Sequence, residues 1–318
     1  MPVLTEDPVD EIVSRFRFKT RSLFNKRDFG ELEKLAKQIR EDKAVFPHGG
    51  RKIFGIYSSF EPRRSEPESL WQLHDEIYQQ WLEEYPESVT AHVAYANFWV
   101  EYAWKARGGG YADTVSDEDW ALFYERLAKA QEVLDLASDL SEQDPHWWRV
   151  SLQVAMGDGW DADAFDQLVD DGHAYDPTYW GIDTIRAFSL LPRWYGESGD
   201  WEAYAESVAR LPDGLGDEAY ARIVLYTKRY YDNVFRETDA SWPQTKRGLD
   251  QIIRKYPESL SLLSNAARLA CVAGDAQAAR KYFNLLNQRY YDRAWESEAE
   301  YIDFYRWAFA AKKQRLLK

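Results

Sequence analysis

A proline-containing phrase that recurs between amphipathic segments is the strongest constraint that this sequence places on its fold. Tyr-Pro-Glu-Ser at Tyr85–Ser88 returns at Tyr256–Ser259, and the Asp-Pro pair at Asp144 returns at Asp176. Each proline follows one amphipathic run and precedes another, and proline is tolerated in the first turn of a helix but not in its interior. We therefore expect each phrase to end one helix and to begin the next.

Between these phrases the apolar residues recur at the three- and four-residue spacing of α-helices. The residues that follow this spacing include Leu32, Leu35, Ile39, Leu122, Leu127, Ala130, Val133, Leu134 and Ala137. No Asn-Gly or Asp-Gly turn joins two alternating runs, so the signals of strands and hairpins are nearly absent. The pattern predicts an all-α fold.

The clearest pair of predicted helices spans residues 260–291, with Gly274 as the turn between them. Small and large residues alternate on the two helices, at Leu263, Ala267, Ala270, Ala279, Phe283 and Leu286. This alternation is similar to that of a tetratricopeptide repeat, in which small residues let paired helices approach. Successive proline anchors are 59, 32 and 80 residues apart. We therefore predict an irregular, tetratricopeptide-like α-solenoid of antiparallel helix pairs.

Two breaks precede the first Tyr-Pro-Glu-Ser phrase, at residues 47–50 and 61–67, both rich in Pro, Gly or charged residues. They predict an N-terminal helical cap and connection at residues 1–70, followed by a helical-repeat domain at residues 71–318. A chain of 318 residues is long enough for one large domain or two small ones.

The net charge of −14 is concentrated in the middle of the chain. Residues 111–220 carry 25 acidic and 6 basic side chains, whereas residues 221–318 carry 11 and 18. Such a segment repels a phosphate backbone, so we do not expect nucleic acid as a partner. It favours a basic protein or peptide, although an acidic surface also serves solubility alone.

Three features bear on the location of the protein. The most apolar stretch, residues 89–104, is short for a bilayer crossing and carries His92, Asn97 and Glu101. The first residues lack the charged start and apolar middle of a secretory signal. Cys271 is the single cysteine, which excludes an intrachain disulfide. We expect a cytoplasmic protein without a membrane partner or a cofactor, and the sequence leaves its oligomeric state open.

Two segments are more distinctive than a solenoid requires. Residues 102–115 contain three consecutive glycines, and residues 190–201 contain Pro-Arg-Trp-Tyr. Together with the Pro-Glu-Ser phrase and the turn at residues 156–160, they resemble the bacterial domain of unknown function 4034 family over about residues 71–210. The resemblance implies a helical-repeat fold and a bacterial source, and it supplies no catalytic residues.

In the first segment the glycines are expected to end a helix beside Trp104 and Arg107. Ser116, with Asp119 three residues later, predicts a capped start of the next helix, after a loop that carries Tyr111. In the second segment a proline interrupts a helix immediately before its arginine.

Both arginines of these segments are able to bind a carboxylate in bidentate fashion. For Arg193 we favour an internal ion pair with Asp200 or Glu197 that locks the turn, over a clamp on a ligand.

Fourteen tryptophans are more than ordinary composition supplies, and two of them are adjacent. Neighbouring residues on a helix face different directions, so one of these two rings is expected to be partly exposed and to line an aromatic groove. The candidate binding residues are Trp104, Arg107, Tyr111, Trp147, Trp148, Trp160, Arg193, Trp194, Tyr195, Asp200 and Trp201.

No catalytic or metal-ligand motif is present, since the five histidines show no HExxH spacing. We therefore expect a non-enzymatic scaffold that binds a basic protein or peptide, as an immunity or adaptor protein does. The alternative is a carbohydrate-active or other hydrolytic enzyme with an aromatic, carboxylate-lined groove. Its candidate carboxylates are Glu197, Asp200, Asp144 and Asp158.

Overall fold

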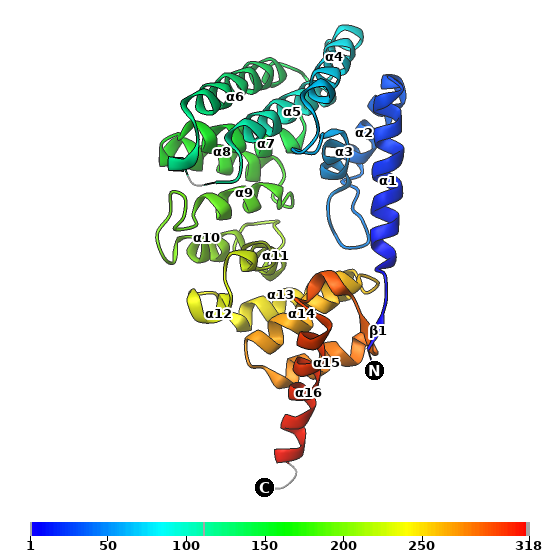
Figure 1. The fold of residues 1–318 in the computed structure, drawn as a ribbon, viewed down its shortest axis with the longest axis vertical. Coiled ribbons are helices and arrows are strands. Elements are labelled where there is room, and N and C mark those ends of the chain that lie inside the picture. Colours follow the sequence, from blue (N-terminus) through cyan, green and yellow to red (C-terminus); the bar gives the residue numbers. More distant parts are fainter. Residues whose placement is uncertain (1, 111, 316–318) are drawn as a thin grey trace. The chain divides into compact units, whose positions relative to one another are not determined.

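The computed structural model describes residues 2–110 and 112–315, with side chains up to residue 310. These residues form sixteen α-helices and one pair of short parallel strands, so the predicted all-α class is confirmed (Figure 1). The strands are β1 (Val3–Leu4) and β2 (Arg289–Tyr290). The helices are α1 (Pro8–Asn25), α2 (Phe29–Glu41), α3 (Lys52–Phe60), α4 (Glu68–Glu84), α5 (Val89–Arg107), α6 (Asp117–Ser138), α7 (Pro145–Asp158), α8 (Ala162–Tyr175), α9 (Gly181–Ser189), α10 (Asp200–Val208), α11 (Asp217–Thr227), α12 (Val234–Glu237), α13 (Trp242–Lys255), α14 (Leu260–Val272), α15 (Ala276–Leu286) and α16 (Glu298–Arg315).

The chain forms two compact units. The terminal unit comprises Met1–Val13, Val45–Gly50 and Ala187–Lys318, and the central unit comprises Ser14–Ala44 and Arg51–Arg186. The boundaries between them fall within α1, at the two ends of a short loop after α2, and within α9. The division predicted at residue 70 lies inside the central unit, near the start of α4.

Helix α5 holds the central unit together. All of its residues from Val89 to Val100 are buried, and it packs against α3, α4, α6 and α7. A helix that is largely apolar around its circumference needs neighbours on every side. Figure 1 shows α6 running beside it. Among the described residues, no helix combines the length and the apolar composition that a membrane crossing requires.

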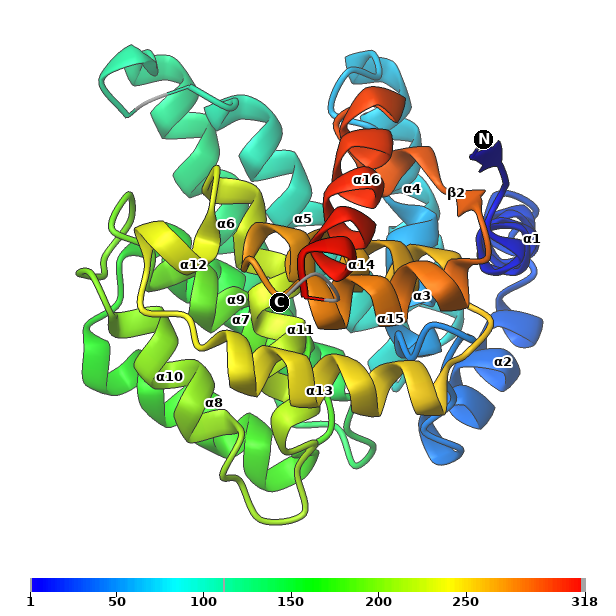
Figure 2. The same cartoon turned by 90° about the horizontal axis from the view of Figure 1, so that it is seen from below.

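In the terminal unit the predicted helix pair around Gly274 is confirmed. Helices α14 and α15 pack together, and Gly274 in the turn between them has a φ of +75°, a conformation that favours glycine. Leu263, Ala267 and Phe283 are buried as predicted. Figure 2 shows α13, α14 and α15 side by side.

The two Tyr-Pro-Glu-Ser phrases form the same junction, one in each unit. The hydroxyl oxygens of Ser88 and Ser259 accept the backbone N–H three residues later, at 2.9 and 3.3 Å, and so cap α5 and α14. Each hydroxyl also donates to a carboxylate, Ser88 to Glu33 at 2.5 Å and Ser259 to Asp7 at 3.3 Å. The prediction that this phrase separates two helices is confirmed.

Asp144 and Asp176 form a second type of helix junction, which occurs twice in the central unit. One carboxylate oxygen of each accepts the N–H two residues later, at 2.8 and 3.1 Å. The other oxygen is held by a buried arginine from elsewhere in the unit. Arg40 on α2 lies 3.1 Å from Asp144, and Arg51, which precedes α3, lies 2.8 Å from Asp176. The Asp-Pro pair thus combines a local turn with a distant cation.

Candidate functional site

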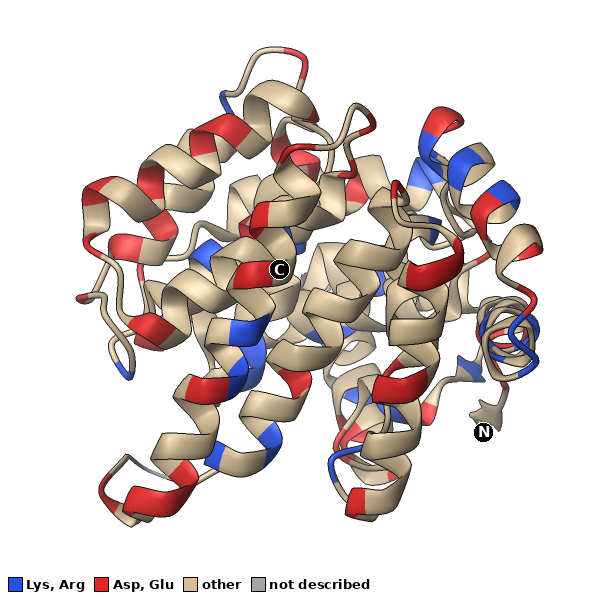
Figure 3. Ribbon diagram, turned by 90° about the horizontal axis from the view of Figure 1, so that it is seen from above, with Lys and Arg blue, Asp and Glu red and all other residues tan. Residues whose placement is uncertain are grey.

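The acidic middle of the chain carries most of its carboxylates at exposed positions of the central unit. Residues 112–186 carry 18 acidic and four basic side chains, and 14 of the acidic ones are exposed. Most of the 14 lie on α6, on α8 and in the turns beside these helices. Figure 3 shows Asp and Glu recurring along α6, which begins beside the short grey trace. We call this surface the acidic face.

Few carboxylates of the acidic face have a cation close by. Among the described residues, three of the 14 form an ion pair, and the other eleven have no cationic side chain within pairing distance. The three pairs are Glu125–Lys129, Glu142–Arg40 and Asp166–Arg186. Exposed charges of one sign that are not neutralised locally create a negative potential that extends about 8 Å into physiological salt.

Exposed apolar side chains lie among these carboxylates. On α6, Tyr124 is 49% exposed and Leu136 is 61% exposed, and Trp160 in the turn between α7 and α8 is 42% exposed. The Tyr124 ring stacks on Trp120 with 5.6 Å between centroids, which restrains it. Aromatic side chains of this kind anchor partners at protein interfaces. The acidic face therefore offers both charge and apolar contacts.

The burial predicted from the helical spacing was wrong for one apolar residue of α6. Leu122, expected on the buried side, is 39% exposed, and Phe123 is buried in its place. Phe123, Leu127 and Ala130 follow one another at intervals of four and three residues, so they share a face. Leu122 lies one position, about 100°, away from that line.

The first predicted segment lies between α5 and α6 in the central unit. As predicted, α5 ends at the glycines, and the Ser116 hydroxyl caps α6 by accepting the Asp119 N–H at 3.1 Å. Trp104 packs edge-on against Phe123. The Arg107 guanidinium donates to the Gly110 carbonyl and lies 5.9 Å from the Trp104 ring. Arg107 thus fastens the loop.

Tyr111, the remaining candidate of this segment, lies outside the described residues. The adjacent tryptophans of α7 divide as expected. Trp148 is buried and stacks on Tyr175 at 4.5 Å, whereas Trp147 is half-buried and donates its indole N–H to the Leu134 carbonyl at 3.0 Å.

The second predicted segment lies in the terminal unit. The Asp200 carboxylate accepts the Glu197 backbone N–H at 2.7 Å, and Arg193 lies over the Tyr230 ring at 5.6 Å. The expected Arg193 ion pair is therefore not formed among the described residues, because Asp200 stabilises the turn through the backbone instead. Trp201 is a core residue, whereas Tyr195 is 61% exposed. Trp194 is half-buried beside Phe188.

The described candidates therefore fall into two groups of five. Those at positions 104, 107, 147, 148 and 160 belong to the central unit, and those at positions 193, 194, 195, 200 and 201 belong to the terminal unit. The carboxylates suggested for a hydrolase divide in the same way. Asp144 and Asp158 lie in the central unit, and the other two in the terminal unit.

The Asp144 carboxylate is held entirely by hydrogen bonds and an ion pair within the central unit. It is fully buried, and one carboxylate oxygen accepts hydrogen bonds from the Tyr57 hydroxyl at 2.6 Å and from Arg40 at 3.1 Å. Burial raises its pKa, against the lowering effects of Arg40 and Tyr57. Because both oxygens are occupied within the unit, Asp144 is a stabilising residue of the α7 junction.

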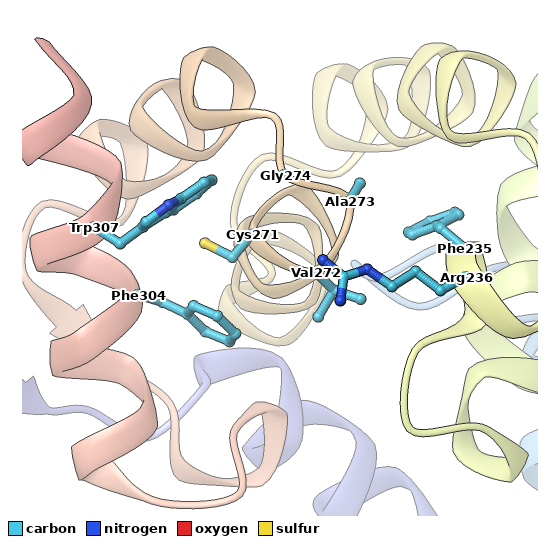
Figure 4. Close-up of a pocket in the computed structure, with 8 residues that line it drawn as sticks. All are labelled: Phe235, Arg236, Cys271, Val272, Ala273, Gly274, Phe304 and Trp307. Atoms are coloured by element: carbon cyan, nitrogen blue, oxygen red, sulfur yellow. The ribbon is translucent and has the colours of Figure 1, made fainter. Parts of the chain in front are cut away.

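A cavity of about 260 Å³ lies within the terminal unit, between α12, the end of α14 and α16 (Figure 4). Phe304 and Trp307 point toward Cys271 from α16, and Arg236 extends toward Val272 from α12. Burial raises the pKa of the Cys271 thiol to about 12, with a smaller contribution from the charge of a nearby glutamate. The thiol therefore stays protonated near neutral pH and is a small apolar wall residue rather than a nucleophile.

The fold is that of an all-α protein built from capped, packed helix pairs. Residues 17–151 match the family model described as a domain of unknown function, DUF4034. The predicted resemblance is confirmed, but the match covers residues 17–151 rather than about 71–210. It includes α2 to α6 and leaves out the segment at residues 190–201. No curated protein matches the chain.

Proposed function

We propose that this protein is a non-enzymatic binding scaffold and that the acidic face of its central unit binds a basic protein or peptide. The observation that carries the proposal is the set of eleven exposed carboxylates without a cation in pairing distance among the described residues. Keeping such like charges together costs stability through mutual repulsion, and a basic partner relieves that repulsion. The proposal places the protein in the bacterial cytoplasm, in an immunity or adaptor role.

The face favours a partner that combines Lys or Arg with a few apolar side chains. Long-range attraction to the carboxylates speeds encounter and weakens as salt rises. Tyr124, Leu136 and Trp160 supply the apolar contacts that hold the complex after encounter. A partner recognised in this way binds faster at low salt and dissociates at a rate that depends mainly on the apolar contacts.

The test compares two variants with the same change in net charge. The face variant carries Glu132→Lys, Asp139→Lys and Asp170→Lys, all at exposed positions of the acidic face. The control variant carries Glu6→Lys, Asp232→Lys and Glu258→Lys, at exposed positions of the terminal unit. Each tagged protein is used to capture partners from its native cell at low and at physiological salt, after circular dichroism has shown equal helix content.

We expect the wild type and the control variant to capture a basic partner. The affinity of the face variant for that partner should be at least about tenfold lower, because three charges of the acidic face are reversed. Equal capture by both variants would remove the acidic face from the proposal. Capture that is insensitive to salt, or capture of an acidic partner, would also contradict it.

A further inference from the structure

The first helix of the central unit carries an exposed basic segment. Residues 14–27, which begin within α1 and end just after it, contain six basic side chains and no acidic one. All six are exposed. When the flanking acids Glu11 and Asp28 are included, the surplus is still four positive charges, in a chain whose net charge is −14. We call the exposed surface of residues 14–27 the basic helix.

The cations of the basic helix have few acidic partners. Among the described residues, Arg17, Lys19 and Lys26 have no carboxylate within pairing distance. Glu31, in the first turn of the next helix, is paired with Lys34 at 2.8 Å. The positive charge of the basic helix is therefore not neutralised locally, and it attracts anionic groups from outside the unit.

An exposed apolar side chain lies among these cations. Phe18 is 77% exposed, the largest fraction for a large apolar side chain in the described part of the chain. Arg17 and Lys19 are its neighbours in sequence, and Arg15 and Arg21 lie one helical turn before and after it. The basic helix thus offers charge together with an apolar contact, as the acidic face does.

The basic helix and the acidic face lie on opposite sides of the central unit. Figure 1 and Figure 2 both show α1 along one edge of this unit and α6 and α8 toward the other. Because residues 14–27, α6 and α8 belong to one compact unit, the two surfaces do not meet within a molecule. They are free to meet between two molecules.

We propose that the basic helix binds the acidic face of a second copy of this chain. The inference rests on the proposed function, because it names the basic partner of that face. Lys and Arg side chains of one copy approach carboxylates of the other, and Phe18 packs among Tyr124, Leu136 and Trp160. Because the two surfaces differ, each contact leaves one surface of each kind free, and further copies add head to tail.

A second copy suits the basic helix better than an anionic membrane, which is another target of basic helices. A net charge of −14 is repelled by anionic lipid as the molecule approaches. A membrane-bound helix also buries a wide apolar face, whereas Phe24 of α1 is buried in the core and Phe18 stands among cations. The acidic face matches both the charge and the apolar side chain.

The test measures self-association of the full chain by sedimentation velocity, at several protein concentrations and at low and high salt. We expect the wild type to associate at low salt, with an association constant at least about tenfold lower at high salt, because salt screens the attraction. A wild type that stays monomeric, or association that salt does not weaken, would overturn the inference. A monomeric wild type that still captures another basic protein would leave the proposed function intact.

Two further variants assign the contact to the basic helix. The helix variant carries Arg17→Glu, Lys19→Glu and Lys26→Glu. Its matched control has the same change in net charge at exposed positions of the terminal unit, with Arg210→Glu, Arg236→Glu and Arg254→Glu. The helix variant and the face variant should each associate at least about tenfold more weakly than the wild type, and the matched control should keep most of the association. Equal losses in the helix variant and its control would overturn the inference.

A mixture of the helix variant and the face variant tests the contact directly, after circular dichroism has shown equal helix content. The mixture still contains an intact acidic face on one protein and an intact basic helix on the other. We therefore expect it to associate at least about tenfold more tightly than either variant alone. A mixture that stays as weakly associated as its two components would overturn the inference.

A single substitution at an exposed position keeps the inference testable if a triple variant does not fold. Phe18→Ser should weaken association about fivefold and leave its salt dependence unchanged. The matched control is Leu4→Ser in the terminal unit, where the side chain is 68% exposed, and it should associate as the wild type does. Equal association of the two serine variants would contradict the proposed contact.

Vesicles of phosphatidylglycerol distinguish a membrane from a second copy. We expect the wild type to remain in solution when such vesicles are sedimented at low salt. Vesicle binding that the helix variant loses would assign the basic helix to a membrane surface and overturn the inference.

Discussion

The central and terminal units use the same two phrases at their helix junctions but complete them with different partners. In the central unit the Asp144 carboxylate is held by the buried Arg40. In the terminal unit Asp7 belongs to a third Asp-Pro pair, and one of its oxygens likewise accepts the N–H two residues later, at 3.0 Å. Its other oxygen accepts the Ser261 N–H at 2.7 Å and the Ser259 hydroxyl at 3.3 Å, so neutral donors stand where the central unit has a guanidinium.

This difference separates what a short phrase determines from what the fold adds. The bond from each aspartate to the N–H two residues later lies within three residues, so the phrase alone specifies it. The second partner lies 104 residues away for Asp144 and 254 residues away for the Ser261 contact of Asp7. A buried carboxylate needs hydrogen-bond or ion-pair partners for its oxygens, and either a cation or several neutral donors can supply them.

The largest effect should come from removing the cation at one central junction. Arg40→Met leaves Asp144 buried without a cation, and we expect a loss of about 3–5 kcal/mol in the free energy of unfolding. Arg51→Met should cost less, about 1–3 kcal/mol, because Lys43 also lies near Asp176, at 3.2 Å, and remains. Urea unfolding at pH 7, with hydrogen exchange to assign the change to the central unit, measures both losses.

The matched change in the terminal unit is Asp7→Asn. It retains one side-chain carbonyl as acceptor and disturbs no ion pair of a buried arginine, but its NH2 group faces one of the two backbone N–H donors that Asp7 accepts. We therefore expect a loss of about 2 kcal/mol, smaller than that of Arg40→Met. A loss as large as that of Arg40→Met would mean that the negative charge of Asp7 is itself needed, and the contrast between the two units would then fail.

A second prediction concerns Glu61, a buried carboxyl of the central unit whose direct partner is the Asn97 amide rather than a cation. Its pKa is raised to about 7 by burial and then by Glu101. The folded state therefore binds this proton more tightly than the unfolded state, so the stabilisation is complete below about pH 4.5 and is lost as the pH rises through 7. Between pH 4 and pH 8 we expect the wild type to lose about 3 kcal/mol relative to Glu61→Gln.

Urea unfolding of both proteins across that pH range measures this difference. The control is Glu83→Gln, at an exposed position of α4, which should keep the pH dependence of the wild type. Parallel curves for wild type and Glu61→Gln would show that the carboxyl is solvated in the native protein and that its pKa is ordinary.

The helices and their junctions could be predicted from the sequence because their causes are local. Gly108 and Gly274 both adopt positive φ at helix ends, and Ser116 caps α6, all as the residue types indicate. The division into units was not predictable in this way. It depends on which helices pack together, and short segments near the N-terminus, such as Val45–Gly50, join residues that follow more than a hundred positions later.

The candidate site was predictable only in part. Net charge along the chain located the acidic segment, because exposure is the default for unpaired carboxylates. The exposed position of Leu122 was missed, since one residue of helical phase decides it. The cavity beside Cys271 had no signal in the sequence. Its lining comes from three separate segments, which only packing brings together.

The smallest expected effect compares the two serine caps. Ser88→Ala and Ser259→Ala each remove an N-cap acceptor, a loss of about 1 kcal/mol. At Ser88 the hydroxyl also donates to Glu33 at 2.5 Å, whereas the corresponding bond from Ser259 to Asp7 is 3.3 Å long. We therefore expect Ser88→Ala to cost about 2 kcal/mol and Ser259→Ala about 1 kcal/mol, measured by hydrogen exchange of the first amides of α5 and α14. Ser88→Thr, which keeps the hydroxyl, should restore most of the difference. Equal losses in the two alanine variants would show that the cap, and not its carboxylate partner, determines the strength of this junction in both units.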